Sequence, residues 1–156
     1  MSMPFTIREA TTHDGDAMLA LMPRLADFEI PERRDPRHLW QDDQALLRRW
    51  LSGERDASLV QVAENDDDLL GFSLTSLRPE PLSHAPAAHL EAIAVAKNAE
   101  GLGVATALLA ACEENARAHG AQFMTLHVFA GNTRARSLYE RCGYEGELLR
   151  YIKSLD

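Results

Sequence analysis

Hydrophobic positions recur along the chain with two different periods, which mark short strands and amphipathic helices. A period of two, typical of strands, occurs at residues 5–8, 58–63, 69–77, 89–95, 123–129 and 147–153. A helical period occurs from Asp14 through Leu25, around the stripe Leu46, Leu47, Trp50 and Leu51, from the stretch 100–105 to about His119, and from Asn132 to Cys142. The order β-α-α-β-β-β-α-β-α-β predicts an α/β fold with a mixed, mainly antiparallel sheet flanked by helices.

Helix-breaking residues set the expected ends of the helices. Pro23 should kink or split the first helix, and Gly53 should end the second. Gly120 and Gly143 stand where the third and fourth helices should end. Residues 27–38 mix acidic and basic side chains with two prolines, which predicts an irregular loop between the first two helices.

The length and composition fit one globular domain spanning residues 1–156. The chain has 46% hydrophobic residues and is long enough to bury a core without disulfides or a structural metal. The longest run without charges or strong breakers, Val104 to Cys112, is shorter than the roughly 20 apolar residues of a membrane span. The first residues lack the pattern of a secretory signal, so we expect a cytoplasmic protein with Cys112 and Cys142 as free thiols.

The charge balance argues against nucleic acid as a partner. The chain has 16 Lys and Arg against 24 Asp and Glu, a net charge of −8. Binding to a phosphate backbone depends on clustered Lys and Arg, and here the arginines are scattered among acids. A cationic or neutral small substrate fits this charge better.

The stretch most informative about chemistry follows the predicted strand at residues 89–95. There the pattern Gly101-x-Gly103-x-Ala105 opens a strongly helical segment. Small residues at a helix start let a ligand approach the backbone, and the free N–H groups with the positive end of the helix dipole favour phosphate oxygens. The same glycines suit a tight connection between helix and sheet, so by themselves they leave both interpretations open.

Two common nucleotide-binding motifs do not fit this stretch. A Walker A loop requires Gly-Lys-Ser/Thr, and no lysine follows these glycines. A dinucleotide-binding fingerprint requires its first glycine at the strand end and a third glycine where Thr106 stands. Here residues 96–100 separate the strand from the glycines. We therefore exclude both motifs.

Three segments together carry a more specific combination of motifs: residues 90–95 (LEAIAV), 101–109 (GLGVATALL) and 132–144 (NTRARSLYERCGY). In this order they resemble the GCN5-related N-acetyltransferase (GNAT) superfamily. The motifs cover the C-terminal half, and the order of elements extends the similarity over nearly the whole chain. The resemblance implies a GNAT-like acyl-CoA N-acyltransferase fold, binding of acetyl-CoA and transfer of its acetyl group, usually to an amine.

The resemblance also implies how acetyl-CoA would bind. The main chain of Ile93, Ala94 and Val95 would bind the pantetheine arm as an added strand does. Asn132 matches an asparagine that contacts pantetheine, and its position also suits the N-cap of the last helix. The pyrophosphate would be held by the main-chain N–H groups of Gly101, Leu102, Gly103, Val104, Ala105 and Thr106.

Glu100 departs from the pattern of the family. Its place is usually taken by Arg or Gln, and a carboxylate beside a pyrophosphate is unfavourable unless its side chain points to solvent. Lys97 would partly compensate for the negative charge, and the backbone donors remain.

Tyr139 and Glu91 are the candidates for catalysis. In the family, Tyr139 corresponds to the tyrosine whose hydroxyl protonates the departing CoA thiolate, although its helical spacing also fits a core aromatic. Strand alternation places Glu91 on the same face as Ile93 and Val95, where a carboxylate calls for a reason. Some family members use a glutamate here, through water, to deprotonate the amine. A partly exposed acid at the mouth of the strand is the alternative.

His89 and His127 are further candidates for the base, because imidazole has a suitable pKa. A lone histidine on a strand is more often structural. No group of His, Cys and acidic residues has metal-ligand spacing, so no metal is expected.

These residues predict an acetyl-CoA-dependent N-acetyltransferase that transfers an acetyl group to a primary amine of a small molecule or peptide by direct attack. The alternatives are a degenerate member that binds CoA or a protein partner without turnover, and a nucleotide-binding regulatory domain. Acidic residues in the loops at 27–38 and 78–86 would attract the amine, whose identity the sequence does not specify. The resemblance suggests a homodimer, and the charge and the lack of a long apolar run predict neither nucleic acid nor a membrane as a partner.

Overall fold

The computed structural model describes residues 4–55, 57–66 and 68–155, and a five-stranded sheet runs through its centre. The strands lie side by side in chain order: β1 (Thr6–Glu9), β2 (Ser58–Glu64), β3 (Leu69–Pro79), β4 (Pro86–Val95) and β5 (Phe123–Leu126). Neighbouring strands are antiparallel except β4 and β5, which are parallel. The predicted mixed, mainly antiparallel sheet is therefore confirmed.

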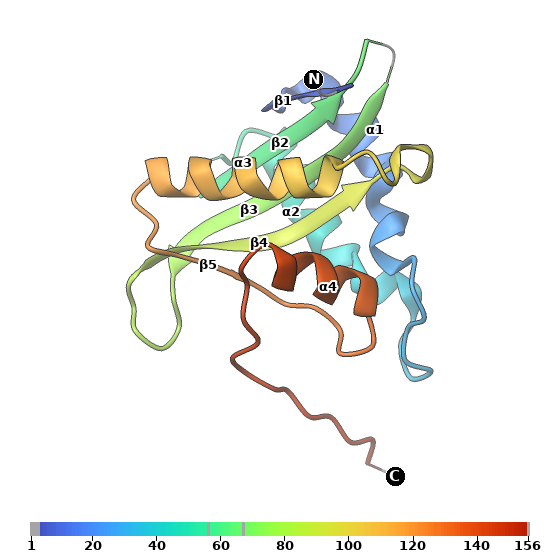
Figure 1. The fold of residues 1–156 in the computed structure, drawn as a ribbon, viewed down its shortest axis with the longest axis vertical. Helices are drawn as coiled ribbons and strands as arrows, with labels where there is room; N and C mark the ends of the chain where they lie inside the picture. The colour runs from blue at the N-terminus through green and yellow to red at the C-terminus, as the bar shows by residue number, and fades with distance from the viewer. Residues whose placement is uncertain (1–3, 56, 67, 156) are drawn as a thin grey trace.

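Helices cover both faces of this sheet (Figure 1). The helix α3 (Val104–Ala118) crosses one face and connects β4 to β5, whereas α1 (Gly15–Leu21) and α2 (Gln41–Leu51) lie on the other face. A fourth helix, α4 (Thr133–Arg141), follows β5. Pro23 splits the first helix as predicted, because α1 ends at Leu21 and the 3₁₀ helix Met22–Ala26 follows it.

Two apolar layers hold the sheet between the helices. On the α1/α2 face, Leu47 and Trp50 are buried against Phe72 of β3, as the predicted stripe of the second helix requires. On the α3 face, Leu108 packs against Leu70. Because β3 and β4 are central strands covered on both faces, β4 is held rigidly from both sides.

β4 contains a bulge at Glu91. Leu90 and Ala92 pair with successive residues of β3, so Glu91 has no partner there. The extra residue interrupts the alternation of side chains, and Leu90 packs on the same face as Ile93. The expectation that Glu91 shares a face with Ile93 and Val95 is therefore wrong, because the bulge turns it toward the face covered by α2.

The predicted last strand, residues 147–153, is also wrong. From Gly143 to the end of the described chain no strand or helix forms, and the segment runs away from the body of the molecule (Figure 1). The sequence has the apolar character of a strand, but a strand needs a neighbouring edge to pair with, and this segment lies against none of the five strands.

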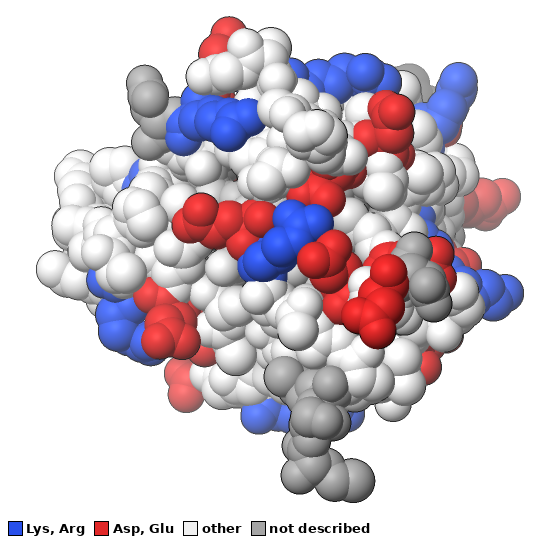
Figure 2. Space-filling view, turned by 90° about the horizontal axis from the view of Figure 1, so that it is seen from above, with Lys and Arg blue, Asp and Glu red and all other residues white. Residues whose placement is uncertain are grey.

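Charged side chains of both signs are interspersed on the surface. Arg8 binds the carboxylates of Asp14 and Glu64, each at 2.8 Å, and so ties β1 to the end of β2 and to the start of the helical region. The face seen in Figure 2 likewise mixes basic with acidic side chains and shows no continuous basic area. Among the helices that the structure describes, none is long and apolar enough to cross a membrane.

Replacing Gly71 by Ala tests the close packing of β3 against β4 and α3. A Cβ at Gly71 would lie 2.8 Å from the backbone oxygen of Ala94 and 3.2 Å from Val104 Cγ1. We expect Gly71→Ala to lower the free energy of unfolding by about 1–3 kcal/mol, which corresponds to several degrees in Tm. Gly131→Ala is the control, because open space surrounds that position. Equal melting temperatures for the two variants would contradict the packing described.

Candidate active site

The strands β4 and β5 separate in the middle of the sheet. Their pairing runs from Ala87–Phe123 to Leu90–Leu126, where β5 ends, three residues earlier than the sequence predicts. β4 continues to Val95 with β3 as its only partner among the described strands. The backbone edge of residues 91–95 is thus open on the side where β5 would lie, which is the edge assigned to pantetheine from the sequence.

The N-terminus of α3 lies just beyond the end of β4. Gly101 and Gly103 have φ angles of 80° and 83°, in the left-handed region that favours glycine. The first intrahelical bond at this end comes from the Ala107 N–H to the Gly103 carbonyl, at 3.0 Å, so the N–H groups of Val104, Ala105 and Thr106 have no carbonyl partner within the helix. A Cβ at either glycine would meet no atom within 4 Å, so neither glycine is required by close packing against a neighbouring element.

The carboxylate of Glu100 faces two arginines. It binds the guanidinium of Arg24, from the 3₁₀ helix after α1, and lies 3.4 Å from that of Arg134 on α4. Arg24 also donates from Nε to the Val95 carbonyl at 3.0 Å. These contacts hold the pKa of Glu100 below its usual value, with Arg24 the main cause. Glu100 is therefore not an unpaired charge, and Arg24 shares its guanidinium group between Glu100 and Asp27.

Tyr139 is half-buried on α4 beside β5. Its ring packs against the cluster that contains Leu90 and Leu109, and it meets the ring of Tyr144 edge-on, with centroids 6.0 Å apart. Burial raises the pKa of the Tyr139 phenol, so the hydroxyl is protonated at neutral pH. Within the described chain the hydroxyl has no hydrogen-bond partner, which leaves its proton available. Asn132 caps α4 by accepting from the Ala135 N–H at 3.3 Å.

Glu91 lies next to a second carboxylate that the sequence reasoning missed. Arg78 Nη2 is 3.4 Å from Glu91 Oε1, and the Glu91 side chain is 19% exposed. The second carboxylate is that of Asp43 on α2. Burial, followed by the charges of Glu91 and Asp42, raises the pKa of Asp43 to about 7. In the sequence Asp43 looks like an ordinary acid at a helix start, and only the fold brings it to Glu91.

His89 has a structural environment. Its ring is buried, its Nδ1 lies 2.7 Å from Thr125 Oγ1, and it packs on His127 with centroids 4.8 Å apart. Burial, with the nearby charges of Arg78 and His127, lowers its pKa to about 4, which makes it a weak base at neutral pH. Among the residues that the structure describes, no group of three or more His, Cys, Asp or Glu side chains is placed to hold a metal ion.

Comparison with known proteins defines the class to which this fold and site belong. A putative acetyl transferase from Pyrococcus furiosus has a TM-score of 0.76 at 25% identity, and covers 97% of this chain and 99% of that one. AAC(6')-Iy, solved with the bisubstrate analogue CoA-S-monomethyl-acetylneamine, has a TM-score of 0.70 at 23% identity, over 97% and 99% of the two chains. The fold is that of the GNAT acetyltransferases.

Sequence similarity assigns the family. The sequence model of the Acetyltransferase (GNAT) family matches residues 22–144. The uncharacterized N-acetyltransferase YhfO of Bacillus subtilis is 33% identical over 141 residues, which cover 89% of each chain. The chain belongs to the GNAT acetyltransferase family.

The burial of Asp43, together with the nearby charge of Glu91, predicts an unusual titration of this carboxyl group. Carboxyl NMR should give Asp43 a pKa of about 7. Glu91→Gln should lower this pKa more than Asp42→Asn does, because the charge of Glu91 contributes more to the raised pKa than the charge of Asp42. Since native Asp43 keeps its proton above the unfolded pKa of 3.8, the free energy of unfolding should fall as pH rises from about 4 to about 7. Asp43→Asn should flatten this slope. A pKa near 4, or a slope unchanged in Asp43→Asn, would show that the two carboxylates are not coupled.

Proposed function

We propose that the protein is an acetyl-CoA-dependent N-acetyltransferase in which an amine attacks the thioester directly. The observation that carries this proposal is the separation of β4 from β5 beyond Leu90. It leaves the backbone edge of residues 91–95 unpaired on that side, with the free N–H groups of α3 following β4 along the chain and the half-buried Tyr139 packed in the cluster that contains Leu90 of β4. A thioester with a long polar arm and a pyrophosphate requires these three features in that order.

Acetyl-CoA would lie along the open edge of β4, with its pantetheine arm and its pyrophosphate both held by backbone groups. The pantetheine amides would pair with Ile93, Ala94 and Val95 in the manner of an added strand. The pyrophosphate would accept from the N–H groups at the start of α3, where the helix dipole also favours negative charge. The CoA-containing analogue bound to AAC(6')-Iy supports the choice of CoA. Asn132, as the cap of α4, would position that helix against pantetheine.

The reaction would proceed by proton removal, attack and proton return. The neutral amine nitrogen bonds to the thioester carbonyl carbon, and a backbone N–H near Ile93 to Val95 stabilises the oxyanion that forms. The intermediate collapses with cleavage of the C–S bond, and the electron pair leaves on sulfur. Tyr139 would donate its proton to this sulfur, and the newly bonded nitrogen would lose one proton to solvent, from which Tyr139 would be reprotonated. The products would be CoA thiol and the N-acetylated amine.

Glu91 is the proposed base, acting through water, with Asp43 beside it. The two carboxylates are close enough to interact, and the pKa of Asp43 is raised to about 7, which suits transfer of an amine proton near neutral pH. Their negative charge also favours an ammonium group over a neutral acceptor. We propose a small-molecule or peptide amine, and the names of two relatives, AAC(6')-Iy bound to an acetylneamine analogue and a mycothiol acetyltransferase 28% identical over 88 residues, favour the small molecule.

A CoA-binding module without turnover is less well supported than the enzyme. The reason for considering this alternative was the unfavourable charge of Glu100. In the structure that carboxylate is paired with Arg24 and Arg134. That pairing weakens the argument for a member without turnover.

Tyr139→Phe tests the proposed function. The variant keeps the ring in its packing and removes only the proton donated to sulfur, so kcat should fall on the order of 10²-fold while acetyl-CoA affinity and Tm change little. The measurement is thiol release from acetyl-CoA with a panel of amines, together with a thermal shift.

Tyr144→Phe is the matched control for this experiment. Its hydroxyl donates to Glu113 Oε2 at 2.9 Å and takes no part in the proposed chemistry, so its rate should stay close to that of the wild type. A wild-type rate for Tyr139→Phe would assign Tyr139 to the core and contradict its role as the acid. The absence of thiol release with every amine would contradict the enzyme.

The pairing of Glu100 predicts a compensating double variant. Arg24→Gln leaves Glu100 with one partner beside the proposed pyrophosphate site, so CoA should bind about fivefold more weakly, the size of an exposed ion pair. Adding Glu100→Gln should restore most of the affinity. Titration calorimetry of CoA binding to the wild type, the two single variants and the double variant gives the coupling free energy between Arg24 and Glu100. Equal weakening by Arg24→Gln in both backgrounds would show instead that Arg24 contacts the phosphates directly.

A further inference from the structure

The end of β5 and the chain that follows it present side chains to the α2 face of the sheet. Met124 and Leu126 of β5 pack on the α3 face, so strand alternation places Thr125 on the opposite face. There its Oγ1 is 2.7 Å from Nδ1 of His89, and the ring of His89 packs on that of His127. His127, the first residue after β5, therefore lies on the same face as the proposed base.

An aromatic contact joins two segments that flank the open edge of β4. Phe129, in the chain after β5, lies against Phe28 of the loop between α1 and α2, with ring centroids 5.6 Å apart and ring planes tilted by 43° (Figure 1). Phe28 follows the 3₁₀ helix whose Arg24 donates to the Val95 carbonyl at the end of β4. The two rings thus link the end of β4 with the chain that leaves β5, beyond the point where the strands separate.

Arg34 of the same loop is a cation without an acidic partner. Its guanidinium carbon lies 6.0 Å from the centroid of the Phe129 ring, and the residue is half-buried. Among the described residues, no carboxylate lies within ion-pair distance of this guanidinium. The neighbouring Asp35 binds Arg37 instead, at 2.8 Å. In a chain with 24 acidic against 16 basic residues, a half-buried guanidinium without a carboxylate calls for a partner from outside the chain.

The two ends of this region carry opposite charges. A guanidinium packed on the face of a ring keeps its in-plane N–H donors, which form a fork that matches the two oxygens of a carboxylate. That is the basic end, at Arg34. At the other end the carboxylates of Glu91 and Asp43 lie close enough to interact, with one guanidinium, that of Arg78, 3.4 Å from Glu91. The region therefore suits a molecule with an ammonium group at one end and an acid at the other.

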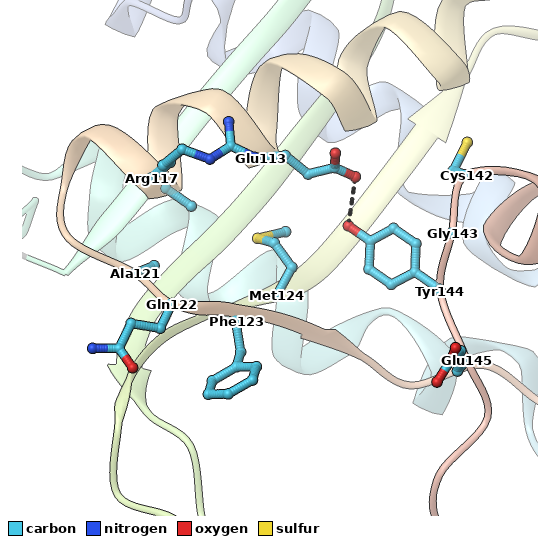
Figure 3. Close-up of a pocket in the computed structure, with 11 residues that line it drawn as sticks. Glu113, Arg117, Ala121, Gln122, Phe123, Met124, Cys142, Gly143, Tyr144 and Glu145 are labelled. Atoms are coloured by element: carbon cyan, nitrogen blue, oxygen red, sulfur yellow. Dashed lines mark hydrogen bonds between the residues drawn. The ribbon is translucent and has the colours of Figure 1, made fainter.

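The groove of about 380 Å³ beside α3 is a poorer place for the acceptor. It lies next to Phe123 and Met124, where β5 is still paired with β4 and leaves no edge of β4 open. Its acid Glu113 already accepts from the hydroxyl of Tyr144 at 2.9 Å (Figure 3). A ligand in this groove would not meet a thioester held on residues 91–95, so the acceptor is assigned to the α2 face.

We propose that the acceptor amine belongs to a molecule that also carries a carboxylate, and that Arg34 binds this carboxylate while the amine lies at Glu91. The inference rests on the proposed acetyl transfer and names the class of its acceptor, an amino acid with its two charged groups at opposite ends. Phe129 supports the guanidinium from one side, and Phe28 holds Phe129 against the loop that carries Arg34.

The test compares amino acids with their amides as acceptors. Glycine, β-alanine and longer ω-amino acids, and the primary amide of each, are assayed by thiol release from acetyl-CoA. At the chain length that spans the two charged ends, the acid should have a kcat/KM about tenfold higher than its amide, the size of a charge-assisted hydrogen bond. Arg34→Gln should remove this preference through KM and change the amides little.

Arg33→Gln is the matched control. Arg33 donates to the Ile152 carbonyl at 3.2 Å and does not lie on Phe129, so this variant should keep the preference for the acid. Neither arginine is in the core, and thermal melting checks that each variant folds. An acid no better than its amide at every chain length would overturn the inference. So would an equal loss of both acceptors in Arg34→Gln, or loss of the preference in Arg33→Gln.

Two further outcomes are decided separately. A preference for phosphoethanolamine over every amino acid would make the anion a phosphate and overturn the carboxylate. Absence of thiol release with every amine would contradict the proposed acetyl transfer, and calorimetry of the same acids and amides in the presence of CoA then tests the site alone. Binding of an acid that Arg34→Gln abolishes would support the site, and equal binding of acids and amides, or no binding, would overturn it.

Discussion

The separation of β4 from β5 beyond Leu90 is the constraint on which the rest of the site depends. While the two strands are paired, their backbone groups satisfy each other, and nothing can bind between them. Where β5 ends, β4 is still held by β3 and by packing on both faces, so its other edge stays extended and unpaired. A rigid, open backbone edge inside a folded domain is rare, because open edges are normally at the border of a sheet.

The bulge at Glu91 lies where β4 and β5 separate, and it sets the direction of the Glu91 carboxylate. By inserting one residue, it turns a carboxylate toward α2 while the neighbouring apolar side chains stay in the core. The fold thereby places Glu91 near Asp43 of α2 and Tyr139 in the cluster with Leu90 and Leu109 on the α3 face of the sheet. The proposed base and the proposed acid therefore lie on opposite faces of the sheet.

Ion pairs and a hydrogen bond join the segments around the end of β4 and the start of α3. Glu100 connects the 3₁₀ helix after α1, through Arg24, with α4, through Arg134, and Arg24 reaches the end of β4 as well. Individually such partly exposed pairs contribute little to stability. They act mainly on geometry, because they hold the loop before α3 against the 3₁₀ helix after α1 and against α4. The residue that departs from the family pattern is therefore part of a local arrangement of charges.

Local patterns predicted most of the fold. The apolar stripe of α2, the split at Pro23 and the helical start after Gly103 each depend on residues a few positions apart, and each is confirmed. The motif residues at the open edge of β4, at the start of α3 and on α4 remain a prediction for the binding site. The relations that the sequence did not reveal join distant residues: the bulge depends on register with β3, and Asp43 and Arg24 reach their partners only through tertiary packing.

The last strand failed for a related reason. Residues 147–153 have the periodicity of a strand, but periodicity indicates which residues suit a sheet and not which edge they join. In the described chain residues 147–153 pair with no strand, and Figure 1 shows this segment running away from β5.

The central claim is that acetyl-CoA lies along the open edge of β4 with its pyrophosphate at the start of α3. Amide hydrogen exchange with and without acetyl-CoA tests it most directly. The account predicts slower exchange at residues 91–95 and 101–106, with NAD and ATP giving no such effect. Unchanged exchange in both segments at saturating acetyl-CoA, or protection only outside them, would contradict it.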